Sequence, residues 1–319
     1  MKTVRIGIIG ILWGAVITSV LPAFAASPIR VMLLDGEQAG AYHAWRETTP
    51  YLKRMLDDAG IFQVDVVTAP LRSGDFSNFK PDWSKYQVVV LNYDAPDERW
   101  PDSLKASFVE YIRNGGGLVS VHASDNAFPN WKEYNLMIGM GGWRGRNEKS
   151  GPHFYYQNGK LVADPSPGSA GSHGARLPFK VVNRVPDHPI TSGLPKEWMH
   201  AGDELYAELR GPGENMTVLA TARSELANDG TGYDEPILMV IAYGKGRIFH
   251  TTMGHDLAAL NCVGFITTYQ RGTEWAATGA VTQKVPSDFP SADKPSTRPE
   301  YDPPPGWTSP GGRQRSQPK

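Results

Sequence analysis

Three histidines and one glutamate have the chemistry and the positions of a catalytic or metal-binding set. His43, His122 and His255 each follow a segment that the sequence predicts to be a strand, and Glu204 lies in the polar stretch Asp203-Glu204-Leu205-Tyr206. Proteins of the α/β class place functional side chains just beyond the ends of such strands, so we expect these four residues to line one site. Imidazole and carboxylate groups act as general acids and bases, or as ligands of a divalent metal such as zinc.

The spacing of these four residues leaves two chemistries open. Zinc sites that are recognised from sequence carry local ligand spacing such as H-E-x-x-H, whereas these residues are scattered along the chain. The same side chains would serve acid–base catalysis on a sugar without any metal. The sequence therefore predicts catalytic roles for His122, Glu204 and His255, with a divalent metal bound by these three and His43 as one form of the site.

The residues beside His255 predict how it is presented. Gly254 permits a sharp turn of the backbone, which would point His255 over the sheet. Asp256 is a further catalytic candidate, because its carboxylate could orient the imidazole through a hydrogen bond. It could equally cap the turn that follows.

Four residues are candidates for substrate binding. Asp35 and His43 lie in the turn after the first predicted strand. Tyr206 and Trp143 are aromatic candidates, since clefts that bind sugars are rich in aromatic side chains. No G-x-G-x-x-G motif follows the first strand, so the sequence gives no anchor for a nucleotide cofactor.

The elements that must position these residues alternate between strand and helix in the first half of the chain. The predicted strands are residues 29–34, 62–67, 86–91 and 118–121. The predicted helices are residues 49–59 and the segment in which Leu104, Phe108 and Ile112 repeat at helical spacing. Because the strands are nearly continuous apolar runs, we expect a parallel sheet that is covered on both faces.

The second half is more irregular. Residues 139–177 are rich in Gly, Ser, His and Pro and predict long loops over the top of the sheet. Strands are expected at residues 179–182, 216–220 and 237–242, with the last paired as a hairpin to residues 247–250, and a closing helix is expected at residues 262–277. Residues 286–319 are rich in Pro, Ser and Gly and predict a disordered tail, which leaves residues 26–285 as the folded domain.

The N-terminus has the pattern of an export signal. Lys2 and Arg5 precede an apolar stretch, and Ala23-Phe24-Ala25 is a small-x-small cleavage site that predicts a signal peptide over residues 1–25. An uncleaved membrane anchor is disfavoured, because the apolar stretch is shorter than the ~20 residues that a span needs and contains Pro22. We therefore expect a periplasmic or secreted protein without an integral membrane segment after cleavage.

Composition excludes some partners. The chain has 32 basic and 33 acidic residues, and this near-neutral balance gives no electrostatic basis for binding nucleic acid. Its single cysteine, Cys262, cannot form an internal disulfide, so stability must come from a hydrophobic core.

Four stretches of the chain resemble, in order, the motifs of the ThuA-like (trehalose-utilisation) family. They are residues 115–123 (GGGLVSVHA), residues 188–190 with 193–195, residues 203–206 (DELY), and residues 244–249 (GKGRIF) with 254–256 (GHD). Arg271-Gly272 followed by Trp275-Ala276-Ala277 completes the resemblance, which covers nearly all of the chain between the signal and the tail. By this resemblance, His122, Glu204 and His255 are the functional positions.

The resemblance implies an α/β fold, a flavodoxin-like three-layer sandwich with a mostly parallel sheet, similar to class I glutamine amidotransferases. Enzymes of that class need a nucleophilic cysteine at the turn after the fourth strand. This chain has His122 there, and Cys262 lies far away in the last predicted helix, so glutaminase chemistry is not expected.

The resemblance also implies a role in carbohydrate use. The leading hypothesis is an exported enzyme that acts on a glycoside or a keto-sugar derivative, with Glu204 and a histidine dividing the acid and base work, in one form around a divalent metal. The alternative is a carbohydrate-binding module that keeps the fold without catalysis. A small-molecule carbohydrate is the expected partner in both cases.

Overall fold

The computed structural model describes Met1, residues 27–38 and residues 42–309. Apart from Met1, the predicted signal peptide lies outside these residues. The strands are β1 (Ile29–Asp35), β2 (Phe62–Thr68), β3 (Val88–Leu91), β4 (Gly117–Val121), β5 (His153–Gln157), β6 (Lys160–Asp164), β7 (Leu177–Asn183), β8 (Glu197–Asp203), β9 (Met216–Arg223), β10 (Asp234–Tyr243) and β11 (Gly246–Thr251). The helices are α1 (Trp45–Asp58), α2 (Asp102–Arg113), α3 (Lys132–Ile138), α4 (Leu257–Leu260) and α5 (Val263–Thr278).

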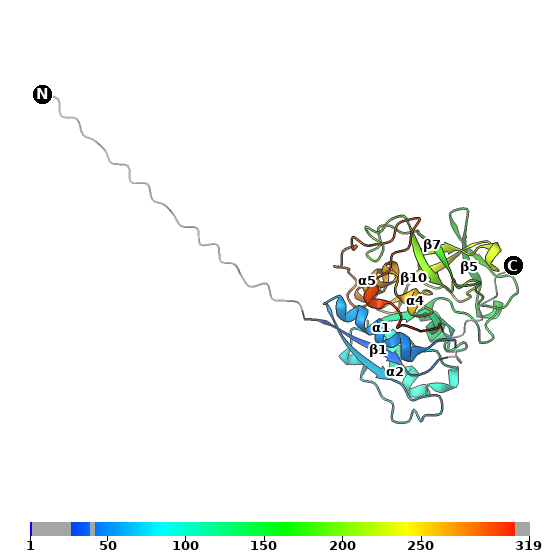
Figure 1. Cartoon of the computed structure of the whole chain (residues 1–319). Coiled ribbons are helices and arrows are strands. Elements are labelled where there is room, and N and C mark those ends of the chain that lie inside the picture. The colour runs from blue at the N-terminus through cyan, green and yellow to red at the C-terminus, as the bar shows by residue number, and fades with distance from the viewer. Residues whose placement is uncertain (2–26, 39–41, 310–319) are drawn as a thin grey trace.

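One mixed sheet organises the domain (Figure 1). Its strand order is β2-β1-β3-β4-β11-β10-β9-β7-β8, with β5 and β6 attached beside β10. The pairs from β2 to β11 are parallel, and those from β11 to β8 are antiparallel. The parallel half has the order of flavodoxin-like folds, in which ligands bind beyond the carboxyl ends of the strands.

Alternating side chains of β1 show why its apolar run is buried on both faces. Val31 and Leu33 point into one core, which the apolar faces of α1 and α5 cover. Met32 and Leu34 point into a second core beneath α2 and α3. Helices on both faces of the sheet make the three-layer α/β sandwich that the sequence predicts.

Two predictions about irregular segments are wrong. Residues 139–177 are not only loops, because they contain the β5–β6 hairpin, whose strand β5 pairs with β10. The predicted disordered tail covers residues 286–319, of which residues 310–319 lie outside the described part of the chain, and residues 286–309 are ordered. They make a C-terminal strap that packs on the domain, with Tyr301 only 1% exposed and its hydroxyl 2.6 Å from the Asp58 carboxylate. The prediction failed because the segment is polar overall, although its aromatic side chains Phe289, Tyr301 and Trp307 pack in or against the first core.

The strap ends near the start of α1. Trp307 Nε1 donates to the Glu47 carboxylate at 2.6 Å, and Ser309 hydrogen-bonds with Arg176 and Asp256. These contacts join the last described residues of the chain to the first turn of α1, which follows His43, and to Asp256, which follows His255.

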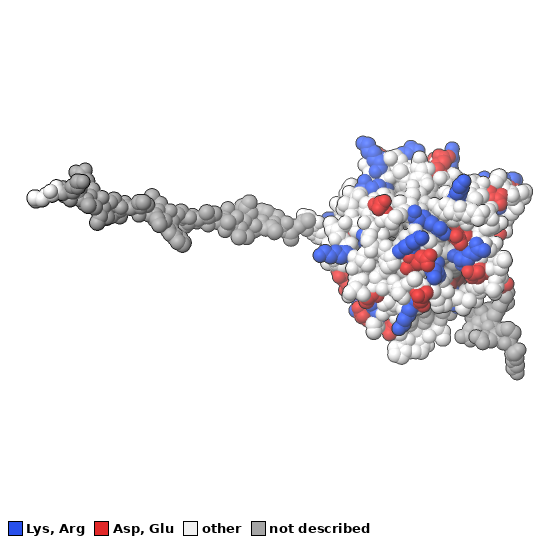
Figure 2. Space-filling model, turned by 90° about the horizontal axis from the view of Figure 1, so that it is seen from above, with Lys and Arg blue, Asp and Glu red and all other residues white. Residues whose placement is uncertain are grey.

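The surface mixes both signs of charge. In Figure 2, Lys and Arg side chains are interspersed with Asp and Glu over the visible face. Among the described residues, no helix combines the length and the apolar character needed to cross a bilayer.

Candidate functional site

Four side chains from separate parts of the sequence meet beyond the carboxyl ends of the strands. His43, His122, Glu204 and His255 each offer one ligand atom, and these atoms all lie within 4.8 Å of one another. The three imidazole rings form a nearly equilateral triangle, with centroids 5.0, 5.1 and 5.3 Å apart. The residues follow β1, β4, β8 and β11, so the sheet itself brings them together. We call these four residues the His₃Glu cluster.

His122 stands directly after β4 in a strained conformation. Its φ of 44° is in the left-handed region, which non-glycine residues adopt mainly where the surrounding structure holds them. Nδ1 lies 2.6 Å from the backbone oxygen of Thr252, and since a carbonyl only accepts, Nδ1 carries the hydrogen. The buried Nε2 has no hydrogen-bond partner and faces the cluster with its lone pair.

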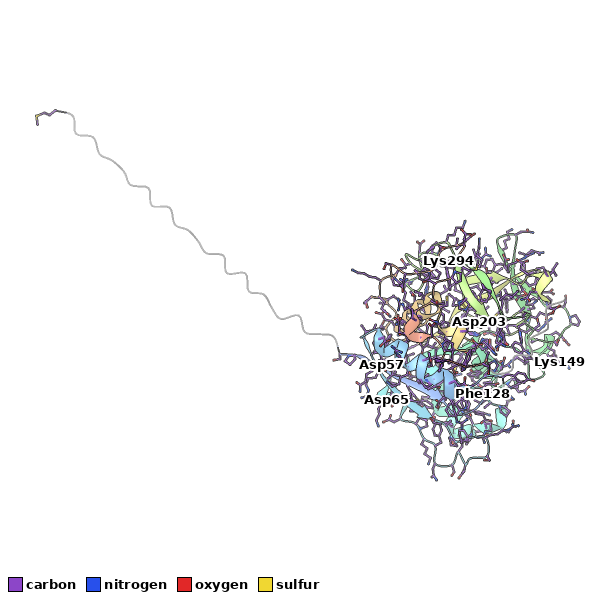
Figure 3. The ribbon with its side chains drawn as sticks, viewed as in Figure 1. Asp57, Asp65, Phe128, Lys149, Asp203 and Lys294 are labelled. Atoms are coloured by element: carbon purple, nitrogen blue, oxygen red, sulfur yellow. The ribbon has the colours of Figure 1, made fainter. Side chains whose placement is uncertain are left out.

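His255 is positioned through its backbone. Gly254 has φ 110°, which places the turn after β11 in a region that glycine adopts without strain. The buried Asp203 carboxylate accepts from the backbone N–H groups of Gly254 at 2.8 Å and His255 at 3.2 Å, and it also contacts His200 Nε2 at 3.0 Å. Figure 3 labels Asp203 in the interior of the domain. This carboxylate therefore fixes the loop that presents the imidazole.

His43 is held by Tyr206. The Tyr206 hydroxyl lies 3.1 Å from His43 Nε2, while Nδ1 of His43 is buried without a hydrogen-bond partner. Tyr206 is 1% exposed, and its ring packs 4.2 Å from that of His122. Such an outer partner fixes the orientation of a ligating imidazole. The predicted role of Tyr206 in contacting substrate does not fit this burial.

Glu204 lies at the partly open side of the cluster. Its Oε2 is 3.0 Å from His255 Nδ1 and 3.8 Å from His122 Nε2, and its side chain is 11% exposed. The contact with His255 is short, but the atoms are not in hydrogen-bond geometry, since His255 Nδ1 has no hydrogen-bond partner. A fifth side chain, His173, places Nε2 at 3.7 Å from the same Oε2.

Burial and mutual contact set the protonation of the cluster. Burial lowers the pKa of His43 to about 3, and that of His122 well below its usual value. Burial opposes the charge on His255 too, but Glu204 outweighs it and raises the pKa. The net pKa of Glu204 is lowered. Burial alone would raise it, but the interactions with His255 and the other imidazoles are together larger. Two neutral imidazoles thus stand beside a His255–Glu204 pair.

The unsatisfied atoms of the cluster match the donor set of a divalent metal. Four buried imidazole nitrogens have no hydrogen-bond partner: His43 Nδ1, His122 Nε2 and both ring nitrogens of His255. Buried polar atoms are normally paired, so a group of orphaned atoms that face one another calls for a ligand. Neutral imidazoles and one carboxylate are donors that suit zinc and similar ions.

Two predicted residues do other work. Asp256 caps α4, because its Oδ1 accepts from the backbone N–H groups of Ala258 at 3.0 Å and Ala259 at 3.1 Å. Its other oxygen pairs with Arg176 at 3.0 Å, so Asp256 does not orient the His255 imidazole. Asp35 is the last residue of β1 and is only 1% exposed, so it is not open to a substrate. Trp143 is half-buried beside the cluster, with its ring 4.5 Å from that of Tyr206.

Sequence reasoning missed two residues. Asp203 stands next to Glu204 in the same motif, but its contact with the His255 loop spans about fifty residues of chain and leaves no local pattern. His173 lies within residues 139–177, where long loops are predicted, and its only signal is the motif Gly171-Ser172-His173-Gly174, in which flanking glycines allow a tight loop.

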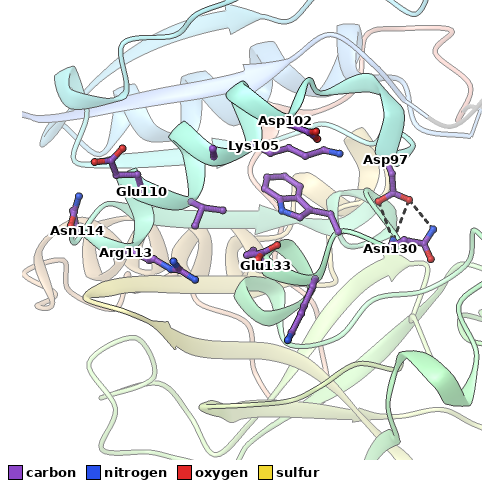
Figure 4. A pocket seen from close by; sticks show the side chains of 12 residues that line it. Asp97, Asp102, Lys105, Glu110, Arg113, Asn114, Asn130 and Glu133 are labelled. Atoms are coloured by element: carbon purple, nitrogen blue, oxygen red, sulfur yellow. Dashed lines mark hydrogen bonds between the residues drawn. The ribbon is translucent and has the colours of Figure 1, made fainter.

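A separate hollow lies away from the His₃Glu cluster. A groove of about 810 Å³ runs between α2 and α3, with Trp131 and several charged side chains along its walls (Figure 4). Asp97 in this groove accepts from Asn130, as the dashed lines show. The size of a hollow therefore does not locate the converging titratable groups in this molecule.

Comparison with known proteins points to one family. Residues 30–276 match the ThuA family model, described as trehalose utilisation. A ThuA-like protein from Parabacteroides merdae is 44% identical, with 87% of this chain and 100% of that chain covered and a TM-score of 0.82. A ThuA-like protein from Bacteroides uniformis shares the fold at 19% identity, with 82% and 97% covered and a TM-score of 0.54. The search of curated proteins found no match.

Proposed function

The chain belongs to the ThuA family, and on that premise we propose that it is an enzyme of carbohydrate use whose His₃Glu cluster binds a divalent metal such as zinc. The substrate class that we propose is a glycoside or a keto-sugar derivative. The observation that carries the proposal is the convergence of four ligand atoms within 4.8 Å, most of them buried without partners.

The supporting residues favour metal binding. Thr252 and Tyr206 each hold the nitrogen of an imidazole that points away from the cluster, which leaves the other nitrogen free to coordinate. Asp203 fixes the backbone of His255. A site in which two imidazoles have orienting partners and the third has a fixed backbone needs little reorganisation when an ion binds.

The chemistry of the site follows from its donors. When bound, a divalent ion polarises a carbonyl or hydroxyl oxygen of a sugar. His43, His122, His255 and Glu204 would hold that ion. In the metal-free form, the contact between Glu204 Oε2 and His255 Nδ1 would instead divide the acid and base work between a carboxylate and an imidazole.

A carbohydrate-binding module on the same fold is the alternative. Such a module would present aromatic platforms without converging titratable groups. The packing of three histidines and a glutamate at one edge of the sheet supports an enzyme, because burying such groups costs stability and they persist where they act on a ligand.

Metal analysis of the purified protein tests the proposal. We expect near-stoichiometric zinc in the wild type and its loss in His255→Ala and in Glu204→Ala, with His188→Ala as a control distant from the cluster. Added zinc should raise the melting temperature of the chelator-treated wild type, because an ion that binds only the folded state stabilises it. A wild type that holds no metal and shows no thermal shift with zinc, manganese or cobalt would contradict the metal site.

We also propose that the protein is exported. The pattern of residues 1–25 supports cleavage before Ala26. N-terminal sequencing of protein from the periplasm or medium should begin at Ala26, and recovery of the full-length chain from the cytoplasm alone would contradict export.

A further inference from the structure

Two side chains form a second tier above the cluster. Trp143 packs with its ring 4.5 Å from Tyr206, and His173 lies 6.2 Å from each of these rings. Tyr206 in turn packs on His122. Trp143 is half-buried and the His173 side chain is 37% exposed, so this tier faces solvent while the cluster beneath it is buried.

His173 is oriented before any ligand arrives. Its Nδ1 lies 2.9 Å from the backbone oxygen of Gly174, so Nδ1 carries the hydrogen and Nε2 keeps its lone pair. Nε2 is 3.7 Å from Glu204 Oε2, on the cluster side. The backbone is fixed on both flanks: Ser172 pairs with Ala207 at 3.0 and 2.9 Å, and Ala175 bonds with the Asn228 side chain at 3.0 and 2.9 Å.

Trp143 is held in an uncommon conformation. Trp143 and Arg144 have φ values of 52° and 49°, two consecutive non-glycine residues in the left-handed region. The Arg144 guanidinium is anchored to the buried Asp94 carboxylate at 2.9 Å. The backbone N–H of Trp143 donates to the backbone oxygen of Ala170 at 2.9 Å. A side chain at Gly171 would approach the indole to 2.6 Å. Strain of this kind persists where surrounding contacts enforce it, and it gathers at ligand sites.

We propose that Trp143 and His173 form a subsite for a pyranose sugar at the open side of the His₃Glu cluster. The apolar face of the sugar ring packs on the indole, and a ring hydroxyl donates to Nε2 of His173. A sugar held there lies next to Glu204. The inference deepens the proposed function and rests on it, since it names the residues that present the carbohydrate to the cluster.

The test is titration calorimetry of the full mature protein with trehalose and with glucose. Sorbitol, which carries hydroxyls without a pyranose ring, serves as the control ligand. We expect the wild type to bind at least one of the two sugars more tightly than sorbitol. Trp143→Ala should weaken binding about tenfold, by loss of the stacking surface, and His173→Ala about two- to tenfold, by loss of one hydrogen bond.

The chain offers a matched pair of control residues. Trp275 and His188 also pack ring against ring, with centroids 5.0 Å apart. Trp275 accepts through its backbone oxygen from Arg247, at the start of β11, and the neighbouring Ala276 lies against Gly117, at the start of β4. This pair therefore lies at the opposite edge of the parallel strands from the cluster. Trp275→Ala and His188→Ala should bind sugar as the wild type does.

The outcomes separate this proposal from the metal site. Absence of sugar binding by the wild type, or wild-type affinity in Trp143→Ala, overturns the subsite. Running the titrations on zinc-loaded and chelator-treated protein distinguishes the two ideas. Zinc uptake without sugar binding overturns the subsite alone, whereas sugar binding that depends on Trp143 in a protein that takes up no zinc supports the subsite and removes the metal.

Discussion

Two buried groups of histidine and glutamate in this protein differ in how their atoms are satisfied. His153 Nε2 lies 2.9 and 3.1 Å from the two carboxylate oxygens of Glu235, which also accepts from the Thr231 hydroxyl at 2.7 Å. This pair joins β5 to β10. In the His₃Glu cluster, by contrast, the ligand atoms of His43, His122 and His255 have no hydrogen-bond partner.

The difference shows that residue type and burial do not identify a functional site. Both groups are imidazoles and carboxylates removed from water, and both sit on strands or just after them. In the His153–Glu235 pair, both carboxylate oxygens and His153 Nε2 have hydrogen-bond partners. The cluster leaves its lone pairs directed at a common space, and it is this unused bonding capacity that indicates a ligand.

The largest expected effect concerns the satisfied pair. Glu235→Ala should lower the free energy of unfolding by about 3–5 kcal/mol, because it strands a buried imidazole. Zinc content should stay at the wild-type level, since the pair lies outside the cluster. Chemical denaturation and metal analysis of the same sample measure both. Loss of zinc in Glu235→Ala with an intact fold would erase the distinction between the two groups.

The second prediction, of intermediate size, concerns the free energy of unfolding at acid pH. An unfolded histidine has a pKa of about 6.5, whereas burial lowers the pKa of His43 to about 3 in the metal-free fold. Between these values the unfolded chain binds a proton that the folded state excludes, so stability falls as the pH drops. From pH 7 to pH 5 one such histidine accounts for a loss of about 2 kcal/mol.

His43→Asn should remove that part of the loss. Urea denaturation of chelator-treated wild type and variant at the two pH values provides the measurement. Identical pH dependence in both proteins would mean that His43 is not kept neutral by the fold.

The smallest effect concerns the outer partner of His43. Tyr206→Phe keeps the ring that packs on His122 but removes the hydroxyl that holds His43. Zinc affinity should fall about tenfold, the lower end of the range for such partners. Competition with a chromophoric chelator measures the affinity. The matched control is Tyr269→Phe, which removes the hydroxyl of a buried tyrosine outside the cluster. This variant should bind zinc as the wild type does.

The sequence was sufficient for the parallel half of the fold. The apolar runs of β1, β3 and β4 and the spacing of Leu104, Phe108 and Ile112 are local signals, and the structure confirms the elements they predict. Strand β8 and the β5–β6 hairpin were not predicted, because β8 has polar residues such as His200 and Asp203 at buried positions and β6 is largely exposed, so neither strand is an apolar run. The hairpin between β10 and β11 was confirmed, since a turn of glycines separates two apolar runs.

The four cluster residues could be proposed from sequence because each lies next to a motif, but their partners could not. Tyr206 reaches His43 across 163 positions, and Thr252 reaches His122 across 130. Such contacts depend on how strands stack and leave no trace in local spacing. Asp256 shows the converse: its place beside His255 suggested catalysis, whereas its atoms cap a helix.

The C-terminal strap has a consequence for how the protein is made. Trp307 and Ser309 attach to the first turn of α1 and to Asp256, and the ribosome adds them after every strand of the sheet. The strands of the sheet and the second core consist of residues that emerge earlier, whereas the first core also includes Tyr301 of the strap. A gene shortened at the start of the proline-rich segment would thus give a product that keeps every strand of the sheet but lacks Tyr301 in the first core and the contacts of the strap with Glu47 and Asp256.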